Sequence, residues 1–461
     1  MNQFTLYGTL IHTPLCGEIE VIERALIEVN EAGTISGVHA PDAESYAAIK
    51  QAADASGRLI TLAEGQYLLP GLVDLHVHAP QWPQAGNVLH LPLYEWLQEY
   101  TFPLEAKYAD LAFAEKAYTS LVETLLANGT TTTLYFATRH LEATKLLADI
   151  CLAKGQRALV GKVAMDDPAE CPDFYRDASV QAGLDDTRAL IDYVRAMPGN
   201  ENERVLPVVT PRFIPSCTDE MLKGLGELAQ EYDCHVQTHC SESDWAHGYV
   251  LNRHGQRDTQ SLHHFKLLTP KTVLAHSIFI NDDDMATIKQ QRSGIAHCPL
   301  SNAYFANAVF PARRALDLGL DVGLGTDVAG GATPSLLQNC HAAITASRYL
   351  EAGVDIEIAQ TERGVPETRI DFKEAFWMAT AGGGRALDLK IGLFKENYAF
   401  DAIVIDTQVA DTNLVVWDEM DQVEDILQKI IYNASRQNIR KVWVQGVLVG
   451  GVDQTYKRRD Q

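Results

Sequence analysis

The sequence lacks the features that mark membrane, secreted and nucleic-acid-binding proteins. No apolar run is long enough to span a bilayer, and the N-terminus has no basic segment followed by an apolar core. Basic residues are scarce, with 38 Lys and Arg against 61 Asp and Glu, so the net charge is -23 at pH 7. Such a charge repels phosphate backbones and anionic lipids. We therefore expect a cytoplasmic protein whose partners include neither nucleic acid nor membrane.

Cysteine is also sparse, and its spacing suggests no disulfide framework. The 8 cysteines are scattered along the chain without a CxxC pair. This spacing is typical of reduced, buried thiols. Cys240 lies next to a candidate metal ligand, but a small buried side chain is its more common role. A reducing compartment is therefore expected.

The middle of the chain alternates apolar strand patterns with amphipathic helix patterns. Between about residue 70 and residue 395, eight strand candidates occur in the order LLPGLVDLHVHA, GTTTTLYFAT, RALVGKVAMD, VLPVVTPRFI, HVQTHC, TVLAHSIFI, GIAHCPLSN and DVGLGTDV. Helical patterns separate them, and the one over 218–233 opens with a plausible cap at Thr218. Buried strands alternating with helices predict an α/β fold, a parallel (β/α)8 barrel of the TIM type.

The two ends of the chain do not follow this alternation. Residues 25–38 have the pattern of two short strands around a turn, and the strand patterns return near the C-terminus. We expect residues 1–69 and 396–461 to form one small β-sandwich domain. Residues 70–395 are expected to form the catalytic barrel.

Five residues of metal-binding type fall at the ends of predicted barrel strands. His76 and His78 are two apart on the first strand, so both point to one face. His239 ends the fifth strand, His276 the sixth and Asp327 the eighth. The carboxyl ends of barrel strands form the face on which barrel enzymes build their sites. Imidazoles and a carboxylate that leave one position for water match a catalytic zinc site, which supplies hydroxide at neutral pH.

These motifs make the chain similar to a known family. It resembles the metal-dependent amidohydrolase superfamily over nearly all its length and, within it, the guanine deaminase family. The resemblance is carried by PGLVDLHVHAPQ, GTTTTLYFAT, VTPRFIPSC, QTHCSES, LAHSIFI, CPLSNAYF and GLGTDVAGG. It implies hydrolysis of the purine base guanine to xanthine and ammonia in purine catabolism. It also implies a homodimer with a single Zn²⁺ in each chain, with Fe²⁺ as the alternative metal.

The resemblance also assigns roles to the residues at the strand ends. It makes four of them metal ligands, namely His76, His78, His239 and Asp327. It places His276 beside the attacking water and makes Glu242 the proton shuttle. Deamination requires such a carboxyl, because NH2⁻ is too basic to leave without a proton. Two alternatives stay open: Glu242 begins a helix and could be a dipole-stabilised carboxylate, and Asp327 could also accept the water's proton.

Two polar residues near the metal motifs could recognise a purine. Arg212 ends the fourth strand, where its guanidinium could donate to a carbonyl oxygen or a ring nitrogen, unless it serves as an ion-pair partner. Gln81 offers both a donor and an acceptor to the guanine edge, although a loop amide can also bond to backbone. The family pattern supports both residues.

The remaining expected contacts with the substrate are apolar or come from the backbone. The family pattern supports Phe213 and places the backbone around Ala79 and Pro80 along the pocket. Trp82 and Phe305 are further candidates for stacking on the ring, although aromatic residues near a barrel mouth are more often simply packed.

Other functions stay open on the sequence alone. Deaminases of cytosine, adenosine-type, pterin or triazine substrates share the metal chemistry. A binuclear cyclic amidase would bridge two metals with a carboxylated lysine, but Lys162 lies on the third predicted strand and not on the fourth, where that resemblance would place it. A non-catalytic scaffold would typically have lost ligands that this sequence retains.

We expect His297, near the end of the seventh strand, to serve in the core.

Overall fold

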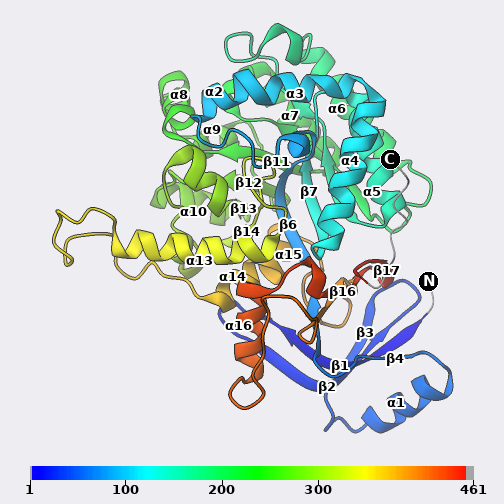
Figure 1. Cartoon of the computed structure of the whole chain (residues 1–461). Helices are drawn as coiled ribbons and strands as arrows, with labels where there is room; N and C mark the ends of the chain where they lie inside the picture. Colours follow the sequence, from blue (N-terminus) through cyan, green and yellow to red (C-terminus); the bar gives the residue numbers. More distant parts are fainter. Residues whose placement is uncertain (1–2, 453–461) are drawn as a thin grey trace.

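The computed structural model describes residues 3–452 and contains two separate sheets (Figure 1). The outermost residues of the expected small domain, 1–2 and 453–461, lie outside the described part of the chain. Within the described part, none of the helices combines the length and the hydropathy needed to cross a membrane.

One sheet is the barrel that the alternating pattern predicts (Figure 1). In chain order its strands are β6 (Leu72–His78), β7 (Thr130–Phe136), β8 (Arg157–Gly161), β10 (Val205–Pro211), β11 (His235–Cys240), β12 (Thr272–His276), β13 (Gly294–His297) and β14 (Asp321–Leu324). Each strand pairs in parallel with its neighbour in this order, and the short β9 (Val163–Ala164) also pairs with β10. Almost every strand residue is buried, because side chains fill the interior and helices cover the outside. The predicted barrel fold is confirmed.

Helices cover the outside of this barrel. The longer ones are α4 (Leu111–Ala127), α5 (Leu141–Lys154), α6 (Val180–Arg195), α7 (Asp219–Tyr232), α8 (Asp244–His254), α10 (Asp282–Gln291), α13 (Leu336–Ala352) and α14 (Phe372–Ala379); shorter ones include α9 (Asp258–His264), α12 (Ala312–Asp317) and α15 (Ala381–Ala386). The expected cap is present, because the side chain of Thr218 accepts a hydrogen bond from Met221 N at 3.2 Å at the start of α7. Two short helices, α2 (Leu93–Trp96) and α3 (Phe102–Ala106), lie between β6 and α4.

The barrel closes at its carboxyl end through the chain that follows β14. Asp327 N donates to the carbonyl of His76 at 2.8 Å, and His78 N donates to the carbonyl of Val328 at 2.8 Å. The buried carboxylate of Asp74 on β6 accepts from the backbone N–H and the hydroxyl of Thr326 at 2.9 and 2.6 Å. These bonds hold Asp327 beside the two histidines of β6.

Residues from both ends of the chain form the second sheet. Its strands are β1 (Phe4–His12), β2 (Glu20–Val29), β3 (Ile35–His39), β4 (Leu59–Thr61), β5 (Gln66–Pro70), β15 (Ala402–Asp406), β16 (Ile439–Val444) and β17 (Val447–Gly450). The sheet curls on itself, because Ile35 N donates to the carbonyl of Tyr398 and Phe400 N to that of Gly33, each at 2.9 Å. A separate apolar core fills the curl. The layers of the expected sandwich are therefore parts of one continuous sheet. Helix α1 (Tyr46–Ala55) joins β3 to β4, and α16 (Val423–Asn433) lies between β15 and β16.

The chain passes from this terminal sheet into the barrel at Gly71. A Cβ atom at this position would lie 2.2 Å from Thr131 Oγ1 on β7, so no larger residue fits without a shift of the strands. The first domain boundary predicted from the sequence, between residues 69 and 70, lies close to this crossing. The division into two domains stays a prediction.

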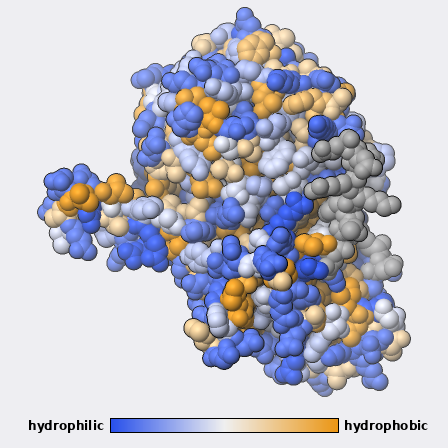
Figure 2. All heavy atoms as spheres, in the orientation of Figure 1, coloured by the Kyte–Doolittle hydropathy of each residue, from blue (hydrophilic) through white to orange (hydrophobic). Residues whose placement is uncertain are grey.

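Helix α13 and the segment after it project from the body of the molecule (Figures 1 and 2). Large apolar side chains are exposed along this projection, including Tyr349 at 61%, Val354 at 78% and Ile356 at 83%. Apolar side chains that remain in water on a projection are typical of a surface that contacts another protein.

A buried ion pair joins the terminal sheet to the barrel. Arg157, at the start of β8, donates through Nε and Nη2 to the two carboxylate oxygens of Asp401 at 3.1 and 3.3 Å. The Arg157 side chain is 8% exposed and that of Asp401 is 1% exposed. Asp401 also accepts from the backbone N–H of Gln445 at 2.7 Å, which ties the hairpin of β16 and β17 to the same carboxylate.

We expect Asp401→Asn to destabilise the fold by about 3–5 kcal/mol, because it leaves the Arg157 guanidinium buried without a counter-charge. Denaturant unfolding followed by circular dichroism would measure the change. The control is Asp185→Asn, which breaks an exposed pair with Arg188 at 3.2 Å and should cost less than about 1 kcal/mol. Equal unfolding midpoints for the two variants would contradict the structural role of the buried pair.

Candidate active site

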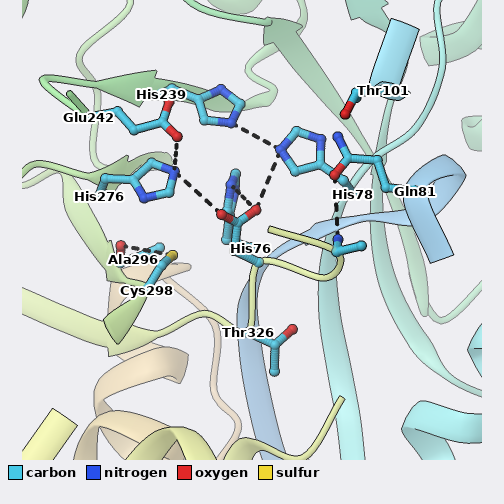
Figure 3. A network of polar contacts seen from close by, with 12 residues as sticks. His76, His78, Gln81, Thr101, His239, Glu242, His276, Ala296, Cys298 and Thr326 are labelled. Atoms are coloured by element: carbon cyan, nitrogen blue, oxygen red, sulfur yellow. Dashed lines mark hydrogen bonds and ion pairs between the residues drawn. The ribbon is translucent and has the colours of Figure 1, made fainter. Parts of the chain in front are cut away.

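Four imidazoles and two carboxylates converge at the carboxyl end of the barrel (Figure 3). They come from four places in the chain and are His76 and His78 on β6, His239 on β11 with Glu242 just after it, His276 at the end of β12, and Asp327 after β14. All six residues are buried. The structure therefore brings together every residue that the sequence proposed for the metal and the proton transfers.

The strands themselves explain this convergence. His76 and His78 are two residues apart on β6, so they share one face. On β11 and β12 the pairing sets His239 opposite Ala275 and Cys240 opposite His276. The backbone turns sharply where the chain leaves the strands.

Those turns use an uncommon backbone conformation. Ser241, His276 and Asp327 have positive φ values of 46°, 67° and 50°, although none of them is glycine. Such conformations cost energy and cluster at functional sites. Here they lie at the end of β12 and shortly after the ends of β11 and β14, where the chain turns at the barrel mouth.

Three imidazole nitrogens and a carboxylate oxygen lie close enough to share one cation. His78 Nε2 lies 3.0 Å from His239 Nε2, and Asp327 Oδ1 lies 3.2 Å from His76 Nε2 and 3.7 Å from His78 Nε2. These contacts are drawn as dashed lines in Figure 3. Nitrogen atoms of His76, His78 and His239 all lie within 4.8 Å of one another.

The protonation of these imidazoles fits a divalent cation. Burial lowers the pKa of His76, His78 and His239 well below its usual value, and neighbouring histidines lower it further, so the rings are neutral. His239 Nδ1 is 2.5 Å from the carbonyl of Arg212 and donates to it, which leaves a lone pair on Nε2. Among the described residues, neither ring nitrogen of His76 has a hydrogen-bond partner. Lone pairs facing one another in a buried space are favourable only around a cation, and a set of nitrogen ligands with one carboxylate suits zinc.

Glu242 and His276 lie next to this cluster. Glu242 Oε1 is 3.5 Å from His276 Nε2, and His276 Nδ1 is 3.0 Å from Asn302 Oδ1. Because the amide oxygen accepts, Nδ1 carries the proton and Nε2 keeps a lone pair directed at the site. Burial, together with the nearby carboxylate of Asp327, raises the pKa of Glu242 to about 8, although Arg212 partly opposes the shift. A carboxyl that exchanges its proton near neutral pH is suited to general acid–base catalysis.

A cavity of about 350 Å³ lies above the cluster. It is lined by His78, Gln81, Leu93, Trp96, Leu97, Arg212, Phe213, His239, Glu242, Phe305, Asp327 and Gly330. The proposed substrate residues Gln81, Arg212 and Phe213 thus share one cavity with His239 and Glu242, and Phe305 lines it as well.

The other proposed substrate residues lie elsewhere. The indole N–H of Trp82 donates to the hydroxyl of Ser120 on α4 at 3.1 Å, and Trp82 does not line the cavity. Ala79 and Pro80 are buried at the start of the 3-10 helix η1 (Ala79–Gln84), and the cavity lining does not include them either.

The sequence reasoning missed residues between β6 and α4. Leu93, Trp96 and Leu97 form part of the cavity wall, and the carboxylate of Glu105 accepts hydrogen bonds from both Arg212 and Gln81. An apolar signal is present in LPLYEWL, which is too hydrophobic for an ordinary connecting loop. Nothing in the spacing of Glu105 relates it to Arg212, which lies 107 positions later in the chain.

Two residues that were not expected to bind the metal contact other side chains. Lys162 follows β8, the third barrel strand, and its ammonium lies 2.5 Å from the carboxylate of Asp177 with both side chains buried. This pairing removes Lys162 from any role as a metal bridge. His297 is buried at the end of β13 against Phe310, with ring centroids 5.1 Å apart, in accord with the expected core position.

Comparison with known proteins agrees with this geometry. The Amidohydrolase family model matches residues 67–449. The chain is 36% identical over 455 residues to a probable guanine deaminase of Schizosaccharomyces pombe, covering 97% of this chain and 83% of that protein. It is 35% identical over 446 residues to the guanine deaminase of Homo sapiens, covering 95% of each.

A solved structure shows the same arrangement of the whole chain. The crystal structure of guanine deaminase from C. acetobutylicum with bound guanine in its active site superposes with a TM-score of 0.85 at 32% identity, covering 97% of this chain and 100% of that one. The family match covers most of the chain, and both relatives exceed 30% identity over nearly all of it. The chain therefore belongs to the amidohydrolase family and, within it, to the guanine deaminases.

Proposed function

We propose that the chain hydrolyses the C–N bond between C2 of guanine and its amino group, yielding xanthine and ammonia. The observation that carries this proposal is the single cavity in which Arg212, Gln81 and Phe213 face His239 and Glu242. A flat purine ring with polar edges fits the first three residues, and hydrolytic chemistry fits the other two. The guanine-bound relative supports the same substrate.

The metal in this proposal is a single zinc ion, with Fe²⁺ as the alternative. His76, His78, His239 and Asp327 would hold it, because their donor atoms converge and the imidazoles are neutral. When bound, such a cation acts as a Lewis acid that lowers the pKa of water from 15.7 to about 7.

Glu242 would carry the protons of the reaction. Its carboxylate takes a proton from the attacking water and passes it to a ring nitrogen of guanine. It then takes the second proton, from the hydroxyl group now bonded to C2, and delivers it to the amino group; the C2–N bond breaks, ammonia leaves and the C2 hydroxyl becomes the carbonyl of xanthine. His276 accepts a hydrogen bond from the water through Nε2, because its Nδ1–H is held by Asn302. Asp327 is a second proton acceptor in this scheme, since its Oδ2 lies 3.8 Å from His276 Nε2.

Recognition of the base would fall to the cavity walls. Arg212 donates to the carbonyl oxygen of guanine, and Gln81 pairs with the ring edge. Phe213 packs against a face of the ring next to His239, since the centroids of the Phe213 and His239 rings are 6.0 Å apart. Phe305 closes the cavity near Trp96, with ring centroids 4.9 Å apart.

The assembly and setting belong to the same proposal. We infer a homodimer, supported by the exposed apolar side chains of Val354 and Ile356 on the projection after α13. A cytoplasmic setting is supported by the 8 cysteines, all of which are free thiols. A role in purine catabolism follows from the proposed substrate.

The substrate is tested by incubating the metal-loaded chain with guanine, adenine, cytosine and pterin in parallel while ammonia release is followed. We expect guanine to be turned over with the highest kcat/KM, because it alone among them presents a purine ring that has both a carbonyl and a 2-amino group. If guanine is inert and another base releases ammonia, the proposed recognition is wrong and the hydrolytic chemistry stands.

The proton shuttle is tested with Glu242→Gln, which keeps the shape of the side chain and removes its acid–base function. We expect kcat to fall by about 10²- to 10⁴-fold with metal content unchanged. The control is Glu220→Gln, an exposed carboxylate on α7, which should retain full activity. Turnover at the wild-type rate by Glu242→Gln would remove the shuttle assignment.

Metal removal provides a separate test. Dialysis against a chelator should abolish ammonia release, and addition of Zn²⁺ should restore it at one equivalent per chain by elemental analysis. Asp327→Ala should lose metal or activity, because the cation then keeps only imidazole ligands. Two metal equivalents in the active wild-type chain would support the binuclear alternative and contradict the single site.

A further inference from the structure

Glu105 is a buried carboxylate that takes no part in the proposed reaction, yet it binds the two polar side chains proposed to recognise the base, Arg212 and Gln81. It lies on α3 with 0% of its surface exposed. Its Oε2 accepts from Arg212 Nη1 at 2.7 Å, and its Oε1 accepts from Arg212 Nη2 at 3.1 Å and from Gln81 Nε2 at 2.9 Å. Glu105 is not part of the cavity lining, so it acts on a ligand through the side chains that it holds, and of these Arg212 and Gln81 line the cavity.

The carboxylate decides which way the amide of Gln81 faces. A carboxylate can only accept hydrogen bonds, so the amide must turn its NH2 group toward Glu105. Its carbonyl oxygen then accepts from the backbone N–H of Ala329 at 3.4 Å. A flipped amide would place two acceptors together in a buried space and leave a donor unpaired. Glu105 therefore sets the order of donor and acceptor that Gln81 shows to a base.

The same carboxylate orients the guanidinium of Arg212 and balances its charge. The two-pronged contact uses one N–H of each terminal nitrogen and leaves other N–H groups free to reach a ligand. The ring of Phe102, also on α3, lies under the guanidinium with its centroid 4.9 Å away. Because the ion pair is neutral overall, it suits an uncharged ring with a carbonyl better than a ligand carrying a carboxylate or a phosphate.

We propose that Glu105 is a positioning residue that makes the cavity selective for a purine with a 6-carbonyl group, by fixing the orientations of Arg212 and Gln81 together. This inference rests on the proposed function above. It predicts that the selectivity is determined by a residue that contacts no substrate atom. Loss of the carboxylate should weaken recognition of the carbonyl more than it weakens binding of the ring.

The experiment compares two competitive inhibitors that cannot be deaminated at C2. Hypoxanthine carries the 6-carbonyl and purine lacks it, so the ratio of their inhibition constants reports recognition of this group. We expect the wild-type chain to prefer hypoxanthine and Glu105→Gln to lose at least about tenfold of this preference, with KM for guanine raised more than kcat is lowered. The unfolded fraction of a preparation cancels in the ratio, so reduced stability alone leaves it unchanged.

Two further variants separate positioning from general stability. Glu105→Asp keeps the charge and withdraws the carboxylate by one methylene group, so it should recover part of the preference, and it carries the test if Glu105→Gln does not fold. Asp177→Asn breaks another buried ion pair, with Lys162, outside the cavity. It should lower stability and leave the preference at its wild-type value.

The outcomes distinguish this inference from the proposed function. If the wild-type chain releases no ammonia from guanine, the proposed function fails. If it does so but shows no preference for hypoxanthine, the positioning role is overturned. The same holds if the preference survives within about threefold in Glu105→Gln or, where Glu105→Gln does not fold, if Glu105→Asp keeps the full wild-type preference. An equal loss of preference in Asp177→Asn would likewise overturn it, because the effect would then be general to buried charges.

Discussion

The seam between the first and last barrel strands is the contact on which the site depends. A parallel barrel brings all the carboxyl ends of its strands to one face, but only closure brings β14 back to β6. Here closure uses the backbone bonds of His76 and Asp327 and the buried contact of Asp74 with Thr326. The same bonds that complete the barrel therefore place the carboxylate of Asp327 against the imidazole of His76, so the stability of the barrel and the geometry of the proposed metal site share one set of interactions.

Buried charge is the second constraint, and the chain satisfies it in different ways at different places. Asp401 and Arg157 compensate each other at the junction of the sheets, as do Lys162 and Asp177 beside the barrel mouth. At the histidine cluster the imidazoles stay neutral because burial lowers the pKa of each ring, which suits the cation proposed for this site. Behind the cavity wall, the carboxylate of Glu105 neutralises Arg212, so the pair presents polar groups without net charge to a polar, uncharged base.

Much of the site follows from rules that act along the chain. Alternation of side chains along a strand places His76 and His78 on one face, and the barrel pattern places His239, His276 and Asp327 at the same end. Residues in the connecting segments follow no such rule, which is why Phe305 lines the cavity while the indole of Trp82 bonds to α4. The terminal strands were expected as a sandwich, and local patterns do not reveal that their layers are one curled sheet.

The sequence by itself determined the barrel, the residues at its carboxyl end and the family, because strand periodicity and strand-end motifs are local properties. Only the tertiary structure decided what surrounds those residues. Glu105 lies on a short helix between β6 and α4, far in the chain from Arg212, and only packing of that helix over the barrel mouth brings the two together. Selectivity depends on such contacts between distant segments, whereas the metal ligands depend on strand ends that the barrel necessarily brings to one face.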